Sequence, residues 1–216
     1  MAAKNKKKTG TATGPVSAKA YFQSGQARKL PIHACFVTEQ WQTSGMVQVI
    51  VSRRHVTGNI TTCFYLVDLL CSGVKDSMYI FNEPEDSLNE IKENIETKGV
   101  SLEPCDYTLA HNIIFAGVEF AAEYGIEPIE EFAITKMMLE EDDESIELID
   151  IECGKDGQPF LVDNGYDPRI SYYLRQLKKN AGEGNYEFVM GDMINNEYED
   201  DDDNDDLKMG KQGSVD

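Results

Sequence analysis

The chain has 216 residues, with 20 Lys/Arg against 39 Asp/Glu and a formal net charge of −19. This length suffices for one substantial core or two small ones, and the acidic balance works against non-specific adhesion of the body to nucleic acid. The longest apolar stretch, around Phe64–Cys71, is far shorter than the roughly 20 residues of a membrane span. No secretory signal is visible, so we expect a cytoplasmic protein without a membrane partner.

Charge is sorted along the chain. Residues 1–55 hold nine Lys/Arg and one acid, a net charge of +8, whereas the other 161 residues hold 11 basic and 38 acidic side chains, a net charge of −27. Residues 1–26 are low in the bulky apolar side chains that offset ordering entropy, which predicts a disordered basic arm with Tyr21 and Phe22 as candidates to dock at its end. Its lysines could contact RNA phosphates: Lys4, Lys6, Lys7 and Lys8.

Strand patterns come next in the chain. Ile32–Thr38 is predicted to be a strand, and Met46–His55 alternates between two faces. The turn signal Thr57-Gly58-Asn59 separates that run from Ile60–Leu70, which is rich in β-branched and aromatic residues. Together these runs predict a hairpin. A short fourth strand is predicted at Met78–Phe81.

Three central helices are predicted after the strands. The first begins at a capping box, Ser87-Leu88-Asn89-Glu90, and ends at Gly99. The second begins near Asp106 and ends at Gly125, and the third covers roughly residues 129–139. The acids of residues 140–147 lack the spacing of an EF-hand loop, so we interpret them as a solvated linker.

The end of the body returns to strands. Ile146–Cys153 and Gln158–Val162 flank Gly154-Lys155-Asp156-Gly157, which predicts a second hairpin. Asp167-Pro168 then begins a helix with basic residues in its last turn, and Asn185–Met190 is predicted to be an edge strand. Strands grouped before helices favour an α+β fold, with an antiparallel N-terminal sheet, central helices and a C-terminal hairpin plus helix in one domain at residues 27–190.

Residues 191–216 are predicted to be a disordered acidic tail. Glu197–Asp206 holds eight acids in ten positions, and self-repulsion keeps such a run extended. We expect these acids to contact a protein with a basic surface: Glu197, Glu199, Asp200, Asp201, Asp202, Asp203, Asp205 and Asp206.

Neither the cysteines nor the histidines predict a metal or cofactor site. The five cysteines are odd in number and form no CxxC pair, which is unlike a zinc site or a disulfide framework. His33, His55 and His111 are more than four residues apart, so they form no helical metal pair.

Asp68 is the strongest candidate for chemistry, because it interrupts an apolar run where an unpaired carboxylate is costly. As a functional residue it would be a metal ligand or general base, with Lys75 as its electrostatic partner and His55 as a weaker catalytic partner across the hairpin. As a structural residue it would cap the following turn or pair with a basic side chain. Both interpretations stay open, and the structural one is favoured.

Arg53 and Arg54 end the second strand, so their side chains point to opposite faces of the sheet. We expect one to reach a phosphate or an acidic partner and the other to form an internal ion pair. Exposed charges that discourage aggregation at a sheet edge are the alternative.

Three segments resemble an uncharacterised family of bacterial hypothetical proteins of unknown function, common in Bacteroidetes-like genomes: Ala27–Val37, Val51–Asp76 and Cys153–Val162. The resemblance covers about residues 27–189. It implies a bacterial, intracellular protein, and it implies no site residues.

The sequence therefore favours a non-enzymatic interaction or regulatory protein whose acidic body and tail engage a basic macromolecular surface. The alternative is a small metal-dependent hydrolase or nuclease-like enzyme centred on Asp68. Asp68 itself separates the two hypotheses, because an enzyme needs its oxygens available to a metal or a second catalytic group.

Overall fold

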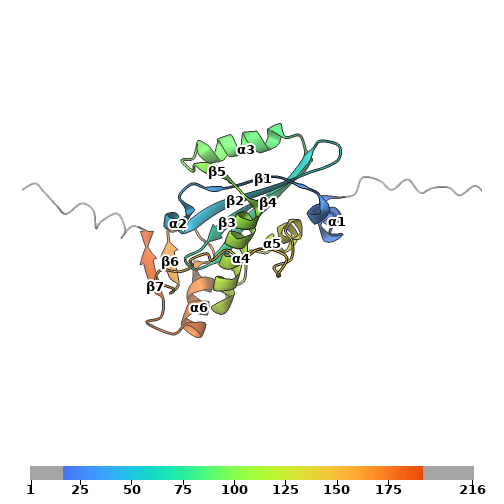
Figure 1. The fold of residues 1–216 in the computed structure, drawn as a ribbon. Helices are drawn as coiled ribbons and strands as arrows, with labels where there is room; N and C mark the ends of the chain where they lie inside the picture. Colours follow the sequence, from blue (N-terminus) through green and yellow to red (C-terminus); the bar gives the residue numbers. More distant parts are fainter. Residues whose placement is uncertain (1–16, 192–216) are drawn as a thin grey trace, which may run out of the picture.

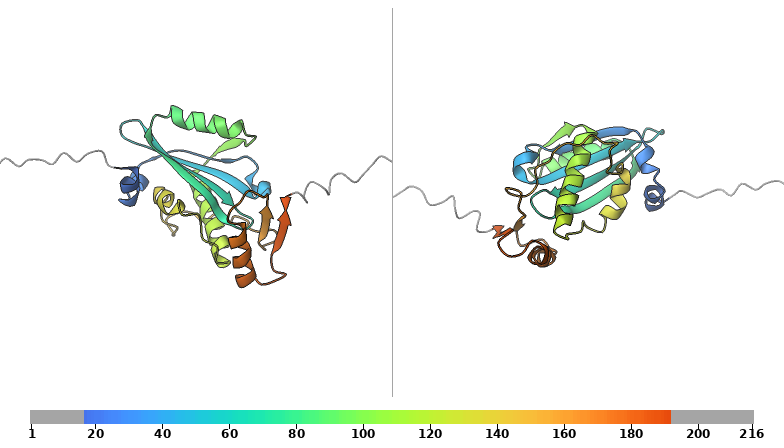
Figure 2. Two further views of the ribbon diagram at one scale, coloured as in Figure 1. Left: turned by 180° about the vertical axis from the view of Figure 1, so that it is seen from behind. Right: turned by 60° about the horizontal axis from the view of Figure 1, so that its bottom comes forward.

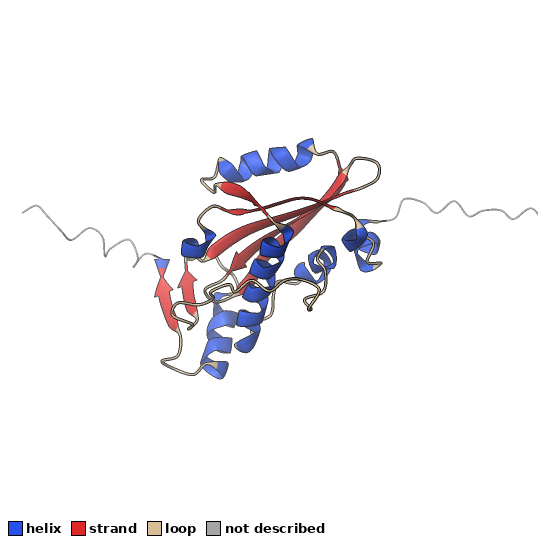
Figure 3. Ribbon diagram, in the orientation of Figure 1, coloured by secondary structure: helices blue, strands red, loops and turns tan. Residues whose placement is uncertain are grey.

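A five-stranded antiparallel sheet organises the protein. The computed structural model describes residues 17–191, and its main sheet has the strand order β4-β3-β2-β1-β5 (Figure 1). Helices cover both faces of the sheet, which gives the α+β fold that the sequence predicts (Figure 3). The strands are β1 (Ile32–Thr38), β2 (Met46–Arg54), β3 (Ile60–Asp68), β4 (Gly73–Glu83) and β5 (Leu102–Cys105).

The predicted central hairpin is confirmed. β2 and β3 pair without a bulge from Met46 opposite Asp68 to Arg54 opposite Ile60. In the turn, the His55 N–H donates to the Asn59 carbonyl at 2.8 Å. β4 is longer than predicted, because it pairs with β3 along most of its length. β5 was not predicted, since it is short and contains Pro104, a residue tolerated only at a sheet edge or bulge.

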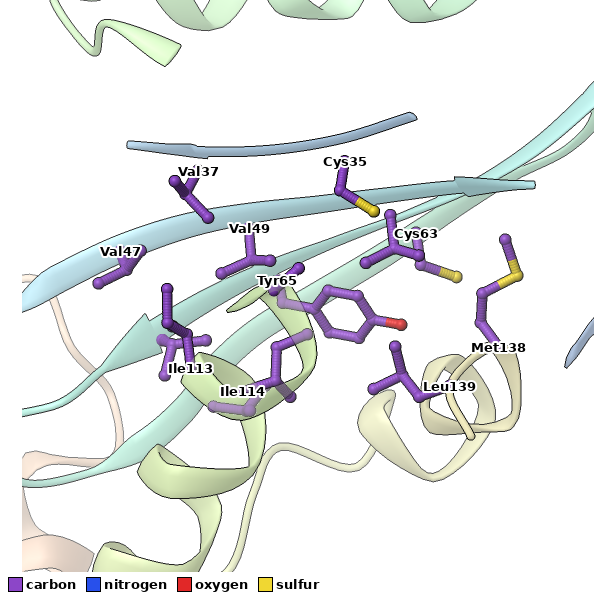
Figure 4. Close-up of a cluster of buried hydrophobic side chains, with 14 of the residues drawn as sticks. Cys35, Val37, Val47, Val49, Cys63, Tyr65, Ile113, Ile114, Met138 and Leu139 are labelled. Atoms are coloured by element: carbon purple, nitrogen blue, oxygen red, sulfur yellow. The ribbon is translucent and has the colours of Figure 1, made fainter. Parts of the chain in front are cut away.

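The larger core lies between the sheet and α4 (Tyr107–Glu123) (Figure 4). Alternate residues of β2 and β3 face α4, including the fully buried Val49 and Tyr65, while Ile50 and Phe64 face the other side. That second face is covered by α3 (Asp86–Glu96). Both faces of β2 and β3 are therefore buried, and the polar side chains Ser52, Thr61 and Thr62 are buried with them.

The helix ends depend on local chemistry. α4 ends in a Schellman motif, in which Gly125 N–H donates to the Ala122 carbonyl at 2.9 Å and Ile126 N–H to the Ala121 carbonyl at 3.0 Å. This is the end that the sequence predicts. The predicted capping box of α3 is wrong, because the helix begins at Asp86 with no side-chain cap.

The predicted third helix is interrupted. In place of one helix over residues 129–139, the chain forms α5 (Phe132–Thr135) and the 3-10 turn η2 (Lys136–Met138). Met138 and Leu139 are fully buried against the sheet, so packing in the core accompanies the change of backbone direction there.

The N-terminal part of the fold begins earlier than the predicted boundary at residue 27. α1 (Ala18–Gln23) places Phe22 in the core, fully buried with its ring centre 4.8 Å from that of Tyr79. The 3-10 turn η1 (Ala27–Lys29) and the short helix α2 (Trp41–Ser44) complete this part. The expectation of a disordered arm over residues 1–26 is therefore wrong for residues 17–26, because Phe22 has a core site to fill.

The C-terminal part is a parallel β-α-β unit. β6 (Phe160–Asp163) and β7 (Glu187–Met190) pair in parallel, and α6 (Ile170–Asn180) connects them (Figure 2). Leu161, Tyr173 and Leu177 form a small core with Ala121 of α4. The predicted helix and final strand are present, but the final strand pairs with β6.

The predicted second hairpin is largely wrong. Asp156 and Gly157 form a tight turn with φ values of 53° and 76°, as type I′ geometry requires, yet a single Lys155–Gln158 bridge follows. Residues 146–153 are not a strand. They are held on α4 by the buried Asn112, which donates to the Glu147 carbonyl at 3.0 Å and accepts from the Ile149 N–H at 2.9 Å.

Candidate functional site

Asp68 closes the turn between β3 and β4. It is 6% exposed, and its Oδ1 accepts a hydrogen bond from the Leu70 N–H at 3.0 Å. Its Oδ2 accepts from the Ser72 N–H at 3.1 Å and from the Ser72 hydroxyl at 2.5 Å. Aspartate side chains commonly cap turns in this way. Both oxygens are used within four residues of Asp68, which is the geometry of the structural interpretation.

Lys75 lines the same cavity as Asp68, with a volume of about 190 Å³. Its Nζ lies 2.7 Å from Asp167 Oδ2, and the two side chains are 17% and 16% exposed. Asp167 also accepts from the Arg169 N–H at 2.8 Å, so it caps the turn that leads into α6. The Lys75–Asp167 ion pair thus joins β4 to the C-terminal unit.

The groups beside this cavity are held in their protonated forms. Burial raises the pKa of Tyr173 to about 12, and the charge of Asp167 adds to the effect. Burial likewise raises the pKa of the Cys71 thiol, with a further contribution from Asp68. A thiol or phenol acts as a nucleophile in its deprotonated form, so neither is activated here.

His55 lies far from Asp68. It follows β2 at the end where Arg54 pairs with Ile60, whereas Asp68 pairs with Met46 at the other end of the hairpin. Eight residues of strand correspond to roughly 27 Å. His55 Nε2 instead lies 2.8 Å from the Thr61 hydroxyl, and burial lowers its pKa. The structure therefore does not bring the predicted His–Asp pair together.

The described residues hold no candidate metal centre. Within residues 17–191, no group of three or more His, Cys, Asp and Glu side chains is arranged to hold a metal ion. Two adjoining hollows, of about 250 and 480 Å³, lie beside α3 on the sheet and share Gln48 and Leu66. Neither is lined by a histidine or a cysteine.

Arg53 is buried and Arg54 is partly exposed, as expected for neighbouring residues whose side chains point to opposite faces of a strand. Arg53 is 2% exposed, and its guanidinium donates to the Met138 and Leu30 carbonyls and to Glu140 at 2.6–3.0 Å. It has no surface with which to contact a partner. Arg54 is 37% exposed in its side chain and lies 2.7 Å from Glu85, so it is the arginine that solvent and partners can reach.

Exposed carboxylates are concentrated in the stretch of chain that runs from the end of α4 through the segment that follows α5. Residues 119–152 hold thirteen Asp/Glu and one basic residue, Lys136. Glu140 and Glu141 pair with Arg53 and Arg28, and the other eleven acids form no ion pair with any residue between 17 and 191. We call the exposed part of this set the acidic surface: Glu119, Glu123, Glu127, Glu130, Glu131, Asp142, Asp143, Glu144, Glu147, Asp150 and Glu152.

Two acids of this surface are in direct contact across segments. Partial burial raises the pKa of Glu119, and so do the hydrogen bond that its protonated carboxyl donates to Asp142 and the negative charges of Asp142 and Glu123. Asp142 belongs to the segment that Asn112 holds on α4. Like charges are therefore held together by the packing of the backbone around them.

The sequence signals only part of this surface. The density of acids near residue 140 is visible in the sequence, but it was interpreted as a solvated linker. Glu119 and Glu123 are on α4 at i and i+4, a spacing that places them on one helix face. What the sequence does not reveal is that residues 140–152 lie back along that face, because the placement depends on long-range bonds from Tyr107, His111 and Asn112 of α4.

Comparisons with known proteins identify no relative. No family model, no curated protein and no solved structure matches this chain, so the resemblance to a bacterial family stays a prediction. No helix among the described residues is long and apolar enough to cross a membrane. The expected RNA contacts of Lys4, Lys6, Lys7 and Lys8, and the partner contacts of Glu197–Asp206, lie outside the described residues.

Proposed function

We propose that this chain is a non-enzymatic interaction protein whose acidic surface and acidic tail bind a basic surface of a macromolecular partner. The observation that carries the proposal is the set of eleven acids between residues 119 and 152 that have no ion-pair partner among the described residues. The commitment of both Asp68 oxygens to backbone and hydroxyl donors supports a binding role over catalysis at that position.

A cationic partner would relieve a repulsion that the fold maintains. Glu119 and Asp142 are in contact although both are acidic, and a lysine or arginine between them would turn this repulsion into attraction. A surface of one sign also speeds association with a partner of the opposite sign and disfavours wrong partners. It repels phosphate backbones, which argues for a basic protein as the partner.

The test uses the full chain and a labelled decalysine peptide as the probe. A surface variant carries Glu119→Gln, Glu123→Gln, Asp142→Asn and Asp150→Asn. A matched control carries four substitutions of exposed acids on and beside α3: Glu83→Gln, Glu90→Gln, Glu93→Gln and Glu96→Gln. Exposed ion pairs contribute about 0.2–1 kcal/mol each, so we expect the surface variant to bind at least about tenfold more weakly and the control to bind nearly as tightly as the wild type.

A third variant separates the tail from the body. It neutralises the eight acids of Glu197–Asp206 in the full chain, and we expect a further loss of affinity when it is combined with the surface variant. Equal losses in the surface variant and the α3 control would contradict the proposal, because binding would then follow net charge alone. Unchanged binding in 1 M salt would also contradict it, since exposed charges are screened within about 3 Å there.

A further inference from the structure

α6 exposes a basic stripe on a protein whose formal net charge is −19. The helix carries three basic residues and no acidic one. Ser171, Arg175 and Lys178 follow the i, i+4, i+7 spacing of one helix face, and with Leu174 and Lys179 they line a shallow depression of about 540 Å³. We call these five residues the α6 stripe.

The bases of the α6 stripe have no acidic partner in the described structure. Residues 17–191 hold 14 Lys/Arg and 29 Asp/Glu side chains, and the six ion pairs in this range are formed by other residues: Arg28, His33, Arg53, Arg54, Lys75 and Lys155. The negative end of the helix dipole accounts for Lys178 and Lys179 in the last turn. It does not account for Arg175, which is in the middle of the helix with its guanidinium 5.8 Å from the centre of the Tyr172 ring.

We infer that the α6 stripe binds the acidic segment Glu197–Asp206 of the same chain. The stripe presents three positive charges along one helix face, and the segment presents eight acids in ten residues. Charge-assisted hydrogen bonds between guanidinium or ammonium groups and carboxylates are the stronger hydrogen bonds in proteins. The half-buried Leu174 at the centre of the depression adds an apolar contact for the stems of the acidic side chains.

The topology places this segment within reach of the stripe. β6 and β7 are parallel and α6 connects them, so α6 runs opposite to β7 and begins near the end where β7 finishes. The six residues from Gly191 to Glu197 span up to about 20 Å when extended, and the eleven residues of α6 form a helix of about 16 Å. The whole stripe is therefore accessible from the end of β7.

The basic arm is the competing site within the chain. It also carries four lysines, Lys4, Lys6, Lys7 and Lys8, but it joins the body at α1, on the opposite side of the molecule from β7 (Figure 2). A short connection raises the effective concentration of two linked sites, which favours the α6 stripe over the arm.

The inference goes beyond the proposed function and does not require it, because the contact is within one chain. If both hold, a basic partner must displace the α6 stripe from the segment before the segment can bind it. Tail neutralisation would then weaken partner binding less than the number of lost charges suggests.

The test is zero-length carbodiimide cross-linking of the full chain, followed by mass spectrometry. The reagent joins lysine amines to carboxylates in contact with them. We expect Lys178 and Lys179 to be linked mainly to acids within Glu197–Asp206, and we expect the yield to fall several-fold between 0.1 M and 1 M salt as the screening length shortens from about 10 Å to about 3 Å. The inference would be overturned if that segment were linked chiefly to the arm lysines. It would also be overturned if the segment were linked equally to lysines all over the body.

Two controls make the result specific. Arg175→Gln removes one charge of the stripe but leaves both reactive lysines, so we expect the links at Lys178 and Lys179 to fall at least about twofold, while the exposed Lys136→Gln leaves them unchanged. Equal yields in both variants would contradict a role for the stripe. A mixture of light and heavy isotope-labelled protein distinguishes the origin of the segment, and links between light and heavy chains would assign it to a second copy and overturn the same-chain contact.

Discussion

The two ends of the β2–β3 hairpin each bury a charged side chain, but they satisfy it in opposite ways. Arg53 bonds to Leu30, Met138 and Glu140, which are 23, 85 and 87 residues away in the sequence. Asp68 bonds to Leu70 and Ser72, two and four residues away. One end of the sheet therefore depends on segments brought together by folding, and the other end is stabilised by its own turn.

This difference predicts how much stability the protein loses when a substitution or deletion changes either end. Removing a local cap disturbs one turn, whereas removing Arg53 or the segments that it holds separates the N-terminal residues and the residues after α5 from the sheet. The following predictions test this contrast from the largest expected effect to the smallest.

Deleting residues 1–26 should destabilise the protein most. The deletion removes α1 and the fully buried Phe22 beside the Arg53 end of the sheet, and loss of one buried phenylalanine side chain alone costs about 3–5 kcal/mol. Deletion of residues 1–16 is the matched control and should leave the free energy of unfolding unchanged. Urea unfolding measures both, and equal stability of the two deletion variants would contradict the core role of α1.

Arg53→Met should lower the free energy of unfolding by about 3–5 kcal/mol, as expected when one member of a buried ion pair is lost. The substitution leaves the Met138 and Leu30 carbonyls without their donor. The neighbouring Arg54→Met is the control, and we expect a loss within about 1 kcal/mol because its pair with Glu85 is exposed. If urea unfolding gave similar losses of free energy for both substitutions, the contrast between the buried Arg53 and the exposed Arg54 would be refuted.

Asp68→Asn should cost about 1–3 kcal/mol, the range for losing hydrogen bonds to a charged group. The new amide group would face the N–H and hydroxyl of Ser72, so donors would meet donors. The exposed Asp76→Asn is the control, with no change expected in thermal or urea unfolding. A fully stable Asp68→Asn protein would count against the structural interpretation and restore the enzyme hypothesis.

The same contrast explains how much of the molecule the sequence predicts. Asp68 as a cap of the next turn, the β2–β3 hairpin and the end of α4 at Gly125 all depend on neighbours within a few residues, and the sequence predicts each of them. The contacts of Arg53, the burial of Phe22 and the position of residues 146–153 on α4 depend on residues far away in the chain. Propensity patterns cannot specify such contacts, so the predictions that the structure corrects are the extent of the arm at residues 17–26 and the second hairpin.

The candidate binding surface also has features that composition predicts and features that depend on contacts between distant residues. The acids near residue 140 and the eight acids of Glu197–Asp206 are evident from composition. The contact between Glu119 and Asp142 is not evident, because it depends on bonds from α4 side chains to a segment far away in the sequence. The pairing of β6 with β7, which places the start of α6 near the end of β7, is likewise a long-range parallel contact that no local sequence pattern predicts.

The smallest predicted effect is the contribution of Glu140 to acid sensitivity. Partial burial raises the pKa of its carboxyl, but hydrogen bonds with Tyr107 and Arg53 and the charge of Arg53 lower it more, so the net shift is below the ordinary value of 4.5. At pH values between the folded and unfolded pKa, the unfolded chain binds more protons. The stability that Glu140 contributes is therefore fully present above pH 4.5 and is lost as the pH falls through the folded pKa.

Glu140→Gln should flatten the dependence of the free energy of unfolding on pH below about 5. The change should amount to less than about 1 kcal/mol, because the side chain is 33% exposed and solvent screens the pair. In the Arg53→Met background the same substitution should flatten the curve less, since the hydrogen bond and the charge of Arg53 no longer lower the pKa of Glu140 and the hydrogen bond with Tyr107 remains. Urea unfolding between pH 3 and pH 7 measures all four proteins. Parallel curves for the wild type and Glu140→Gln would show that the Arg53 end is stabilised by its bonds to carbonyl groups alone. The contrast between Arg53 and Asp68 would then be only that Arg53 bonds to residues far away in the sequence and Asp68 to residues nearby.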